Sequence, residues 1–410
     1  MQEFGSRYFE YTVYINFDHE KRLHDFLEES IDPQRLLTAF EAIAGETIHA
    51  KDTLIILDEI QEKPRVLSAL KYFCEEAPEY AIIAASSLLS SQWGATLHQG
   101  SFFPAGKVEL LDLYPLSFRE FLLATQSKRF MTLLEERDLA MITTLRSSYI
   151  EALRLYFFVG GMPEAVNTYL ATKSLLMVRE VQKKLLNCYR QDFSKHAPVS
   201  LVPRINQVWD SIPSQLAKEN KKFTYRQIFK GARAKDFELA ISWLSGSGLI
   251  HLVHRVKKPG LPLKSYQEQN AFKVYVNDIG LLGALGELPA SCMIEKNRIF
   301  MALHGAMTEQ YVLQQLVSDM RKKPYYYVAI NSLGKIDFLV QGEVILWPVE
   351  VQAEENLQAK SLKAFAKKYD VKKSIRISLS HYREQEWFIN LPLYGFMSLW
   401  PEEAGEKQPS

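Results

Sequence analysis

The sequence predicts an α/β protein with more than one domain. Residues 53–57 and 80–85 are nearly continuous apolar runs, as in strands that are buried on both faces of a parallel sheet. Helical segments separate these runs, and that alternation is typical of an open α/β sheet. The length of 410 residues corresponds to two or three domains at roughly 150 residues each.

The first region, residues 1–125, is predicted to hold this parallel sheet. Residues 11–17 are rich in β-branched and aromatic side chains and form the first expected strand. Helices are expected around 34–47 and 64–76, between the strands.

The second region, residues 126–290, is expected to be mostly helical. Just before it, Ser117 and Glu120 have the spacing of a capping box, so a helix should begin there. The pair Gly160-Gly161 interrupts the helices. Two helices at 223–229 and 235–244, followed by strands at 249–256 and 272–276, have the order of a winged helix. The loop between these strands would be the wing, with the basic residues Arg255, Lys257, Lys258 and Lys264.

The third region, residues 291–410, is predicted to be a compact α/β unit with a mixed sheet. A helix is expected near 299–321. Strands are expected at 325–330, 335–340 and 344–351, followed by a helix at 360–369 and strands near 374–379 and 393–399.

Composition excludes several classes of protein. A net charge of +1 gives no sign of a nucleic-acid or membrane partner, so such a surface must be local. A hydrophobic content of 47% excludes wholesale disorder. Cys74, Cys188 and Cys292 lie far apart, which argues against a disulfide framework and favours a reducing cytoplasm. No apolar run reaches the roughly 18 residues of a membrane helix, so we expect no membrane partner.

The sharpest local motif is the acidic pair Asp58-Glu59, directly after an apolar strand. Ligands of open α/β sheets bind at the carboxyl edge of the strands. In a nucleoside triphosphatase an aspartate there orients magnesium, and the neighbouring glutamate polarises the attacking water. Ser86 and Ser87, at the end of the next strand, would bring hydroxyl groups to the same edge. The plain alternative is a strand that ends in a solvated acidic turn.

Several segments in order carry a family resemblance. They are LIILDEIQ at 54–61, SSLL at 86–89, GKVELLDLYPLSFREFL at 106–122, VGGMPEAV at 159–166 and YVNDIGLLGAL at 275–285. With them the chain resembles the bacterial and archaeal AAA-type ATP-binding proteins that carry a C-terminal domain of uncharacterised function. The resemblance implies ATP and magnesium as cofactors, Walker B roles for Asp58 and Glu59, and the sensor-1 position for Ser86 or Ser87.

The phosphate-binding loop of such proteins is not found in this sequence. They open with a strand, a Gly-x-x-x-x-Gly-Lys-Ser/Thr loop and a helix. The nearest string, from Gly100 to Val108, has five residues between its glycines and valine in place of the hydroxyl. We therefore expect a partial nucleotide domain with impaired ATP binding and hydrolysis, through a misplaced start, a frameshift or a true truncation. Loss of a central strand should also expose inner sheet edges.

The third region resembles the PD-(D/E)xK nucleases. Glu309 on a helix, Asp337 on a strand and Glu350 at the end of the next strand follow the order of their acidic residues, which hold magnesium. Gln352 stands where those enzymes have a lysine that stabilises charge on the phosphate. An amide cannot supply this charge, so cleavage is not expected even if the metal binds. The plain alternative is three carboxylates on a structural sheet.

Three functions remain open. The leading hypothesis is an AAA-type ATP-binding protein with an incomplete nucleotide site. The alternative is a non-enzymatic DNA- or protein-binding module that uses the winged helix and a degenerate nuclease-like domain, although a basic loop is more often simply solvated. The third is a metal-dependent nuclease, whose nicking activity Gln352→Lys should increase.

Overall fold

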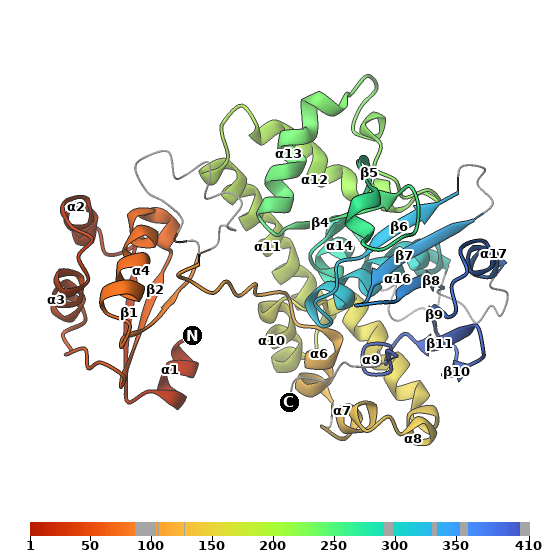
Figure 1. Cartoon of the computed structure of the whole chain (residues 1–410), viewed down its shortest axis with the longest axis horizontal. Helices are drawn as coiled ribbons and strands as arrows, with labels where there is room; N and C mark the ends of the chain where they lie inside the picture. Colours follow the sequence, from red (N-terminus) through yellow and green to blue (C-terminus); the bar gives the residue numbers. More distant parts are fainter. Residues whose placement is uncertain are drawn as a thin grey trace. The chain divides into compact units, whose positions relative to one another are not determined.

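The computed structural model describes residues 1–86, 104, 106–126, 128–290, 298–329, 334–352 and 360–401, with the side chains of 298–304 left out. The chain divides into two compact units, Met1–Leu113 with Gly246–Gly248, and Tyr114–Ser245 with Leu249–Ser410 (Figure 1). The α/β class is confirmed, because the described residues form a three-stranded sheet in the first unit and an eight-stranded sheet in the second.

The first unit contains a parallel sheet in the order β1-β2-β3, as the apolar runs predict. Its strands are β1 (Tyr11–Asn16), β2 (Thr53–Asp58) and β3 (Ala81–Ala84). Tyr11 pairs with Thr53, and Leu54 pairs with Ala81. Residues 53–57 are fully buried, which explains why the central strand has no polar alternation.

The helices of the first unit are α1 (Gln2–Tyr8), α2 (Arg22–Glu29), α3 (Pro33–Ala44) and α4 (Arg65–Glu76), with a 3-10 turn η1 (Ile60–Glu62). Asp32 caps α3 by accepting a hydrogen bond from the Arg35 amide, and Gly45 ends it with a φ of 72°. The helices at 34–47 and 64–76 are confirmed. Helix α2 was not predicted, because its eight residues are too few for a clear period.

Strand β3 is an edge of the described sheet, since it pairs with β2 alone among the described residues. Its four residues are half-buried, although their sequence is that of an inner strand. Further along the same unit, Leu110, Leu111 and Leu113 are exposed, Leu113 by 91%. An apolar edge strand carries unpaired N–H and C=O groups, which can accept a further strand.

The second unit is built on a mixed sheet in the order β10-β11-β9-β8-β7-β6-β4-β5. Its strands are β4 (Ile250–Val256), β5 (Gln267–Val276), β6 (Tyr325–Val328), β7 (Lys335–Gln341), β8 (Leu346–Val351), β9 (Ser374–Ser378), β10 (Arg383–Glu384) and β11 (Phe388–Pro392). The β4–β5 hairpin joins this sheet through a parallel bridge between Arg255 and Tyr326. The middle and C-terminal regions therefore share one sheet, and the limits at 125 and 290 stay predictions.

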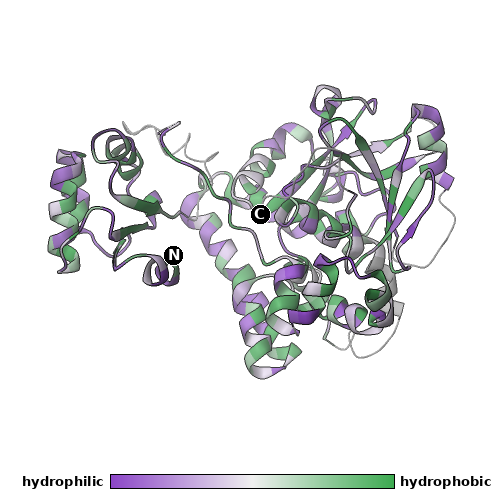
Figure 2. Ribbon diagram, turned by 60° about the horizontal axis from the view of Figure 1, so that its bottom comes forward, coloured by the Kyte–Doolittle hydropathy of each residue, from purple (hydrophilic) through white to green (hydrophobic). Residues whose placement is uncertain are grey.

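The helices of the second unit are α6 (Phe118–Thr125), α7 (Lys128–Glu135), α8 (Leu139–Thr144), α9 (Arg146–Val159), α10 (Pro163–Thr172), α11 (Leu175–His196), α12 (Val202–Leu216), α13 (Ala234–Gly246), α14 (Ile279–Leu285), α16 (Arg298–Ser318) and α17 (Lys360–Tyr369), with 3-10 turns η3 (Tyr225–Gln227) and η4 (Leu263–Tyr266). Hydrophilic and hydrophobic residues both occur along most of the helices (Figure 2), whereas α14 is almost entirely apolar and buried. No helix in the described ranges is long and apolar enough to cross a membrane.

Two predicted elements are wrong. Residues 223–229 contain only the turn η3, because the chain at Phe223 bonds instead to the Phe272 carbonyl of β5. Residues 393–399 are turns, and the last strand, β11, lies just before them. Residues 393–399 are apolar and mostly buried, whereas residues 223–229 are mixed, with Phe223 buried and Arg226 exposed. Neither pattern distinguishes a short strand or helix from a turn.

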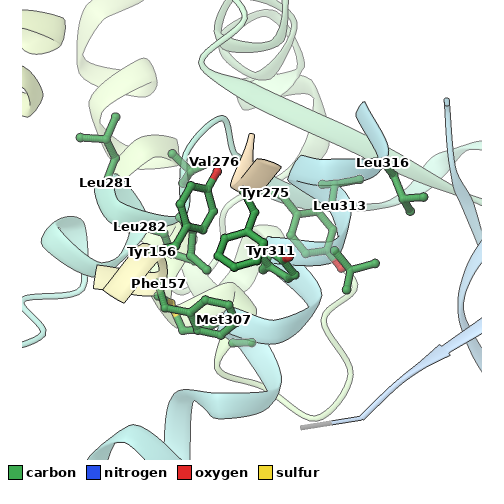
Figure 3. Close-up of a cluster of buried hydrophobic side chains, with 14 of the residues drawn as sticks. Tyr156, Phe157, Tyr275, Val276, Leu281, Leu282, Met307, Tyr311, Leu313 and Leu316 are labelled. Carbon is green, nitrogen blue, oxygen red and sulfur yellow. The ribbon is translucent and has the colours of Figure 1, made fainter. Parts of the chain in front are cut away.

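One large core holds the second unit together (Figure 3). Tyr156 of α9, Tyr275 of β5 and Tyr311 of α16 are fully buried in it. The capping box of Ser117 and Glu120 starts α6, as predicted. At Gly161 a Cβ would lie 2.1 Å from the Leu116 carbonyl oxygen, so only glycine permits this approach.

Candidate functional site

The acidic pair of the first unit lies at the carboxyl end of β2. Asp58 is the last residue of the strand, and its Oδ2 accepts a hydrogen bond of 2.5 Å from the Tyr14 hydroxyl on β1. That bond raises the pKa of Tyr14. Glu59 follows with a φ of 54° and ψ of 40°, a left-handed conformation that is uncommon for glutamate. Six other described residues that are not glycine also have a positive φ, among them Lys51 and Lys173, so this conformation does not by itself identify a functional site.

A polar chain extends from Glu59 to the next strand. Gln61 donates to the Glu59 carboxylate, and Ser86 donates to Gln61 Oε1 over 3.0 Å. Ser86 thus lies one side chain away from Glu59, whereas Ser87 lies outside the described residues. The structure brings Asp58, Glu59 and Ser86 to one edge of the sheet, where the sequence expected them.

The predicted wing is the loop between β4 and β5. Lys257, Lys258 and Lys264 are exposed there. Arg255 differs from them, because its guanidinium pairs with the Glu268 carboxylate on the neighbouring strand. The carboxylate holds the pKa of Arg255 above its usual value. Of the four predicted basic side chains, the three lysines are therefore exposed, and Arg255 is held in an ion pair.

Glu309 of α16 is buried among cations. Its Oε2 accepts hydrogen bonds from the Tyr275 hydroxyl (3.0 Å) and from Lys273 Nζ (3.2 Å). Its Oε1 contacts the ammonium groups of Lys221 and Lys335, the latter at 3.4 Å. Burial alone would raise the pKa of Glu309, but the three lysines outweigh it and hold that pKa well below its usual range.

Asp337 and Glu350 lie on neighbouring antiparallel strands. Asp337 accepts from Lys335 Nζ at 2.8 Å and from the Val351 amide at 3.0 Å. Glu350 faces Arg376 at 3.4 Å, and burial raises the pKa of Glu350 despite that guanidinium. The Gln352 side-chain oxygen is buried and accepts no hydrogen bond from the described residues. Glu309 and Asp337 are joined through Lys335, while Glu350 is paired separately.

The lysines around Glu309 did not emerge from the sequence reasoning. Lys273 and Tyr275 are two apart on β5, and Lys335 and Asp337 are two apart on β7, so each pair shares a face of its strand. This spacing of two residues along a strand was the feature of the sequence that could have identified them. Among the described residues, no three His, Cys, Asp or Glu side chains are grouped so that they could hold a metal ion.

Comparisons with known proteins identify the class of the first unit. Residues 1–122 match the AAA domain family. Residues 150–291 match the domain of unknown function DUF8612, and residues 304–394 match the domain of unknown function DUF4143. The chain therefore carries an AAA domain, a class that binds nucleotides, followed by two domains without a known function.

Similarity to individual proteins is slight. Among solved structures, a Walker-type ATPase of Pyrococcus abyssi is 12% identical, with a TM-score of 0.38, and the match covers 67% of this chain and 84% of that one. The comparison with curated proteins gave no match.

Proposed function

We propose that this protein is an AAA-type ATP-binding protein whose residues 1–122 contribute the magnesium-positioning half of a nucleotide site. The observation that carries the proposal is the pair Asp58 and Glu59 at the carboxyl edge of a parallel sheet. Carboxylate oxygens are ligands that Mg²⁺ prefers, so the donor set fits the metal.

Each residue has a distinct role in this proposal. Asp58, oriented by Tyr14, would hold magnesium and its waters. Glu59, oriented by Gln61, would accept a proton from the attacking water, and Ser86 would keep Gln61 in place. Bound magnesium-ATP would supply the phosphoryl group, and its magnesium ion would offset the negative charge of the phosphate oxygens.

The phosphate-binding half of the site is not supplied by any motif in the sequence. A glycine-rich loop binds phosphates through its backbone amides and its lysine. We therefore propose that ATP binding and hydrolysis by this chain are impaired. In isothermal calorimetry, magnesium-ATP should bind the chain no more tightly than it binds Asp58→Ala. Micromolar binding that Asp58→Ala abolishes would overturn the proposed impairment.

A gain of function tests the assigned residues. A strand and a Gly-x-x-x-x-Gly-Lys-Ser loop fused ahead of Met1 should give ATP turnover. Glu59→Gln should abolish that turnover but retain ATP binding, since the amide cannot accept the proton. The matched control is Glu62→Gln, a carboxylate of the same turn. Turnover that survives in Glu59→Gln would show that the role of Glu59 is wrong.

A second candidate function is DNA binding by the winged-helix region of the second unit, in which the turn η3 stands in place of the first expected helix. The exposed basic residues favour this function. Besides the wing lysines, the basic side chains exposed around η3 and α13 are Arg226, Lys230, Arg233 and Lys235. Exposed cations bind phosphates with a strong dependence on salt. A protein partner at this surface is the alternative within the same proposal.

The pairing of Arg255 provides a sharp test. The triple variant of Lys257, Lys258 and Lys264 to alanine should lose salt-dependent retention of duplex DNA, whereas Arg255→Ala should keep most of it. A triple variant of Lys360, Lys363 and Lys367 on α17 removes the same charge elsewhere and is the matched control. Equal loss in both triple variants would indicate a general charge effect and would argue against the wing.

A further inference from the structure

The two carboxylates Glu309 and Asp337 are bridged by an amine of the chain itself. Lys335 Nζ lies 2.8 Å from Asp337 Oδ1 and 3.4 Å from Glu309 Oε1. In the nuclease-like arrangement, the space between these acids would belong to a divalent cation. Here an ammonium group contacts both carboxylates.

Two more lysines complete the surroundings of Glu309. Lys273 is 1% exposed and approaches Oε2, and its ammonium also lies over the rings of Tyr326 (5.0 Å) and Phe338 (5.8 Å). Lys221 contacts Oε1. Burial lowers the pKa of Lys273, and Glu309 opposes that change. Each of the three lysines therefore contacts a carboxylate among the described residues.

The charge balance of this network disfavours a metal ion. Lys221, Lys273 and Lys335 carry three positive charges against the two negative charges of Glu309 and Asp337, and Glu350 is balanced by Arg376. With Lys335 in place, a divalent cation would raise that excess from one positive charge to three. Buried charges are stable only when they are paired, so these residues do not fit a magnesium ion while Lys335 is present. Without the Lys335 charge the excess would be two, and loss of the proton of Lys273, whose pKa burial already lowers, would bring it back to one.

We propose that the ammonium group of Lys335 occupies the position of the divalent cation in the nuclease-like site. The site then binds no divalent cation as long as this lysine is present. Of the three lysines, Lys335 is the one that a cation from solvent could replace, because its side chain is 37% exposed while those of Lys221 and Lys273 are nearly buried. Removal of its charge would leave Glu309 and Asp337 with a gap between them that solvent can reach. This inference does not depend on the proposed nucleotide site.

The test is a titration with Mn²⁺ in which electron paramagnetic resonance measures the concentration of the free ion. All proteins carry Asp58→Ala, so that the first unit contributes no binding. The parent should bind no Mn²⁺ up to about 1 mM, the weak limit of protein sites. Lys335→Met should gain a site at least about tenfold tighter than this limit, and Asp337→Asn in the same chain should remove it again. Lys257→Met, an exposed lysine, is the matched control and should gain nothing.

Three outcomes decide the inference. A gain of Mn²⁺ binding in Lys335→Met that depends on Asp337 supports it. Mn²⁺ binding by the parent that Asp337→Asn abolishes overturns it, because the lysine would then not exclude the ion. No gain in a folded Lys335→Met also overturns it. If Lys335→Met does not fold, Lys335→Gln, which keeps a donor for Asp337, is titrated in its place under the same criteria.

Discussion

The acidic residues of the two units have different kinds of hydrogen-bond and ionic partners. Asp58 in the first unit is held by a phenol and a backbone amide, and Glu59 by a side-chain amide. Glu309 in the second unit is surrounded by three lysines and is 4% exposed. Hydroxyl and amide donors orient a carboxylate but leave its charge, whereas ammonium groups cancel it. Among the described residues, the donors of the first site leave its negative charge uncompensated, as the proposed magnesium site requires, whereas lysines offset the charge of Glu309 in the second.

The largest expected effect is the loss of the buried charge at Glu309. Glu309→Gln should lower the free energy of unfolding of the second unit by about 3–5 kcal/mol, because three lysines would lose their shared partner. Urea titration followed by tryptophan fluorescence measures it, since Trp209, Trp243, Trp347, Trp387 and Trp400 all lie in this unit. Glu151→Gln, an exposed carboxylate of α9, should change it by less than about 0.5 kcal/mol. Equal effects of the two variants would show that the buried carboxylate of Glu309 stabilises the unit no more than an exposed carboxylate does.

A third buried carboxylate, that of Asp278, allows the effect of the lysines around Glu309 to be tested through the pH dependence of stability. Asp278 caps α14, accepts hydrogen bonds from the Gly161 amide (2.6 Å) and the Leu281 amide (2.9 Å), and has no lysine or arginine partner among the described residues. Burial raises the pKa of Asp278 despite those bonds, whereas the lysines lower the pKa of Glu309. The two carboxyl groups should therefore contribute to stability with opposite dependence on pH.

The sign follows from proton linkage. The contribution of Asp278 is present below the ordinary pKa of about 3.9 and is lost as the pH rises through its folded value. Asp278→Asn should therefore gain stability relative to the parent above about pH 4, by about 1.4 kcal/mol for each unit by which the pKa is raised. The contribution of Glu309 is present above about pH 4.3 and is lost as the pH falls. Urea midpoints between pH 3 and pH 7 measure both, and a constant difference for Asp278→Asn would contradict the assignment.

The smallest effect is expected at Asp58. Asp58→Asn should change the stability of the first unit by less than about 1 kcal/mol, because it alters one hydrogen bond at a partly exposed position. Tyr14→Phe, which removes the same bond from the other side, is the matched control. Hydrogen exchange of the β1 and β2 amides reports the change. A loss as large as that of Glu309→Gln would mean that Asp58 is a structural residue.

Much of the fold could be read from periodicity. The three strands of the first unit, the capping box at Ser117 and most strands of the second unit lie where the sequence places them. Two segments that were predicted as regular elements are turns. Residues 223–229 are a short stretch of mixed polarity, and residues 393–399 are an apolar, mostly buried run that fits a strand as well as a packed turn. The shared sheet of the middle and C-terminal regions was also missed, because one bridge between Arg255 and Tyr326 joins segments 71 residues apart.

The sequence by itself determined the α/β class, the acidic pair after a buried strand and the order of the three acids in the third region, because these depend on local pattern. Only the tertiary structure decided which charges meet. Lys221, Lys273 and Lys335 come from three separate segments, and their convergence on Glu309 depends on how α16 packs against the sheet. A local pattern identifies a carboxylate, but its charge state depends on neighbours that folding brings together.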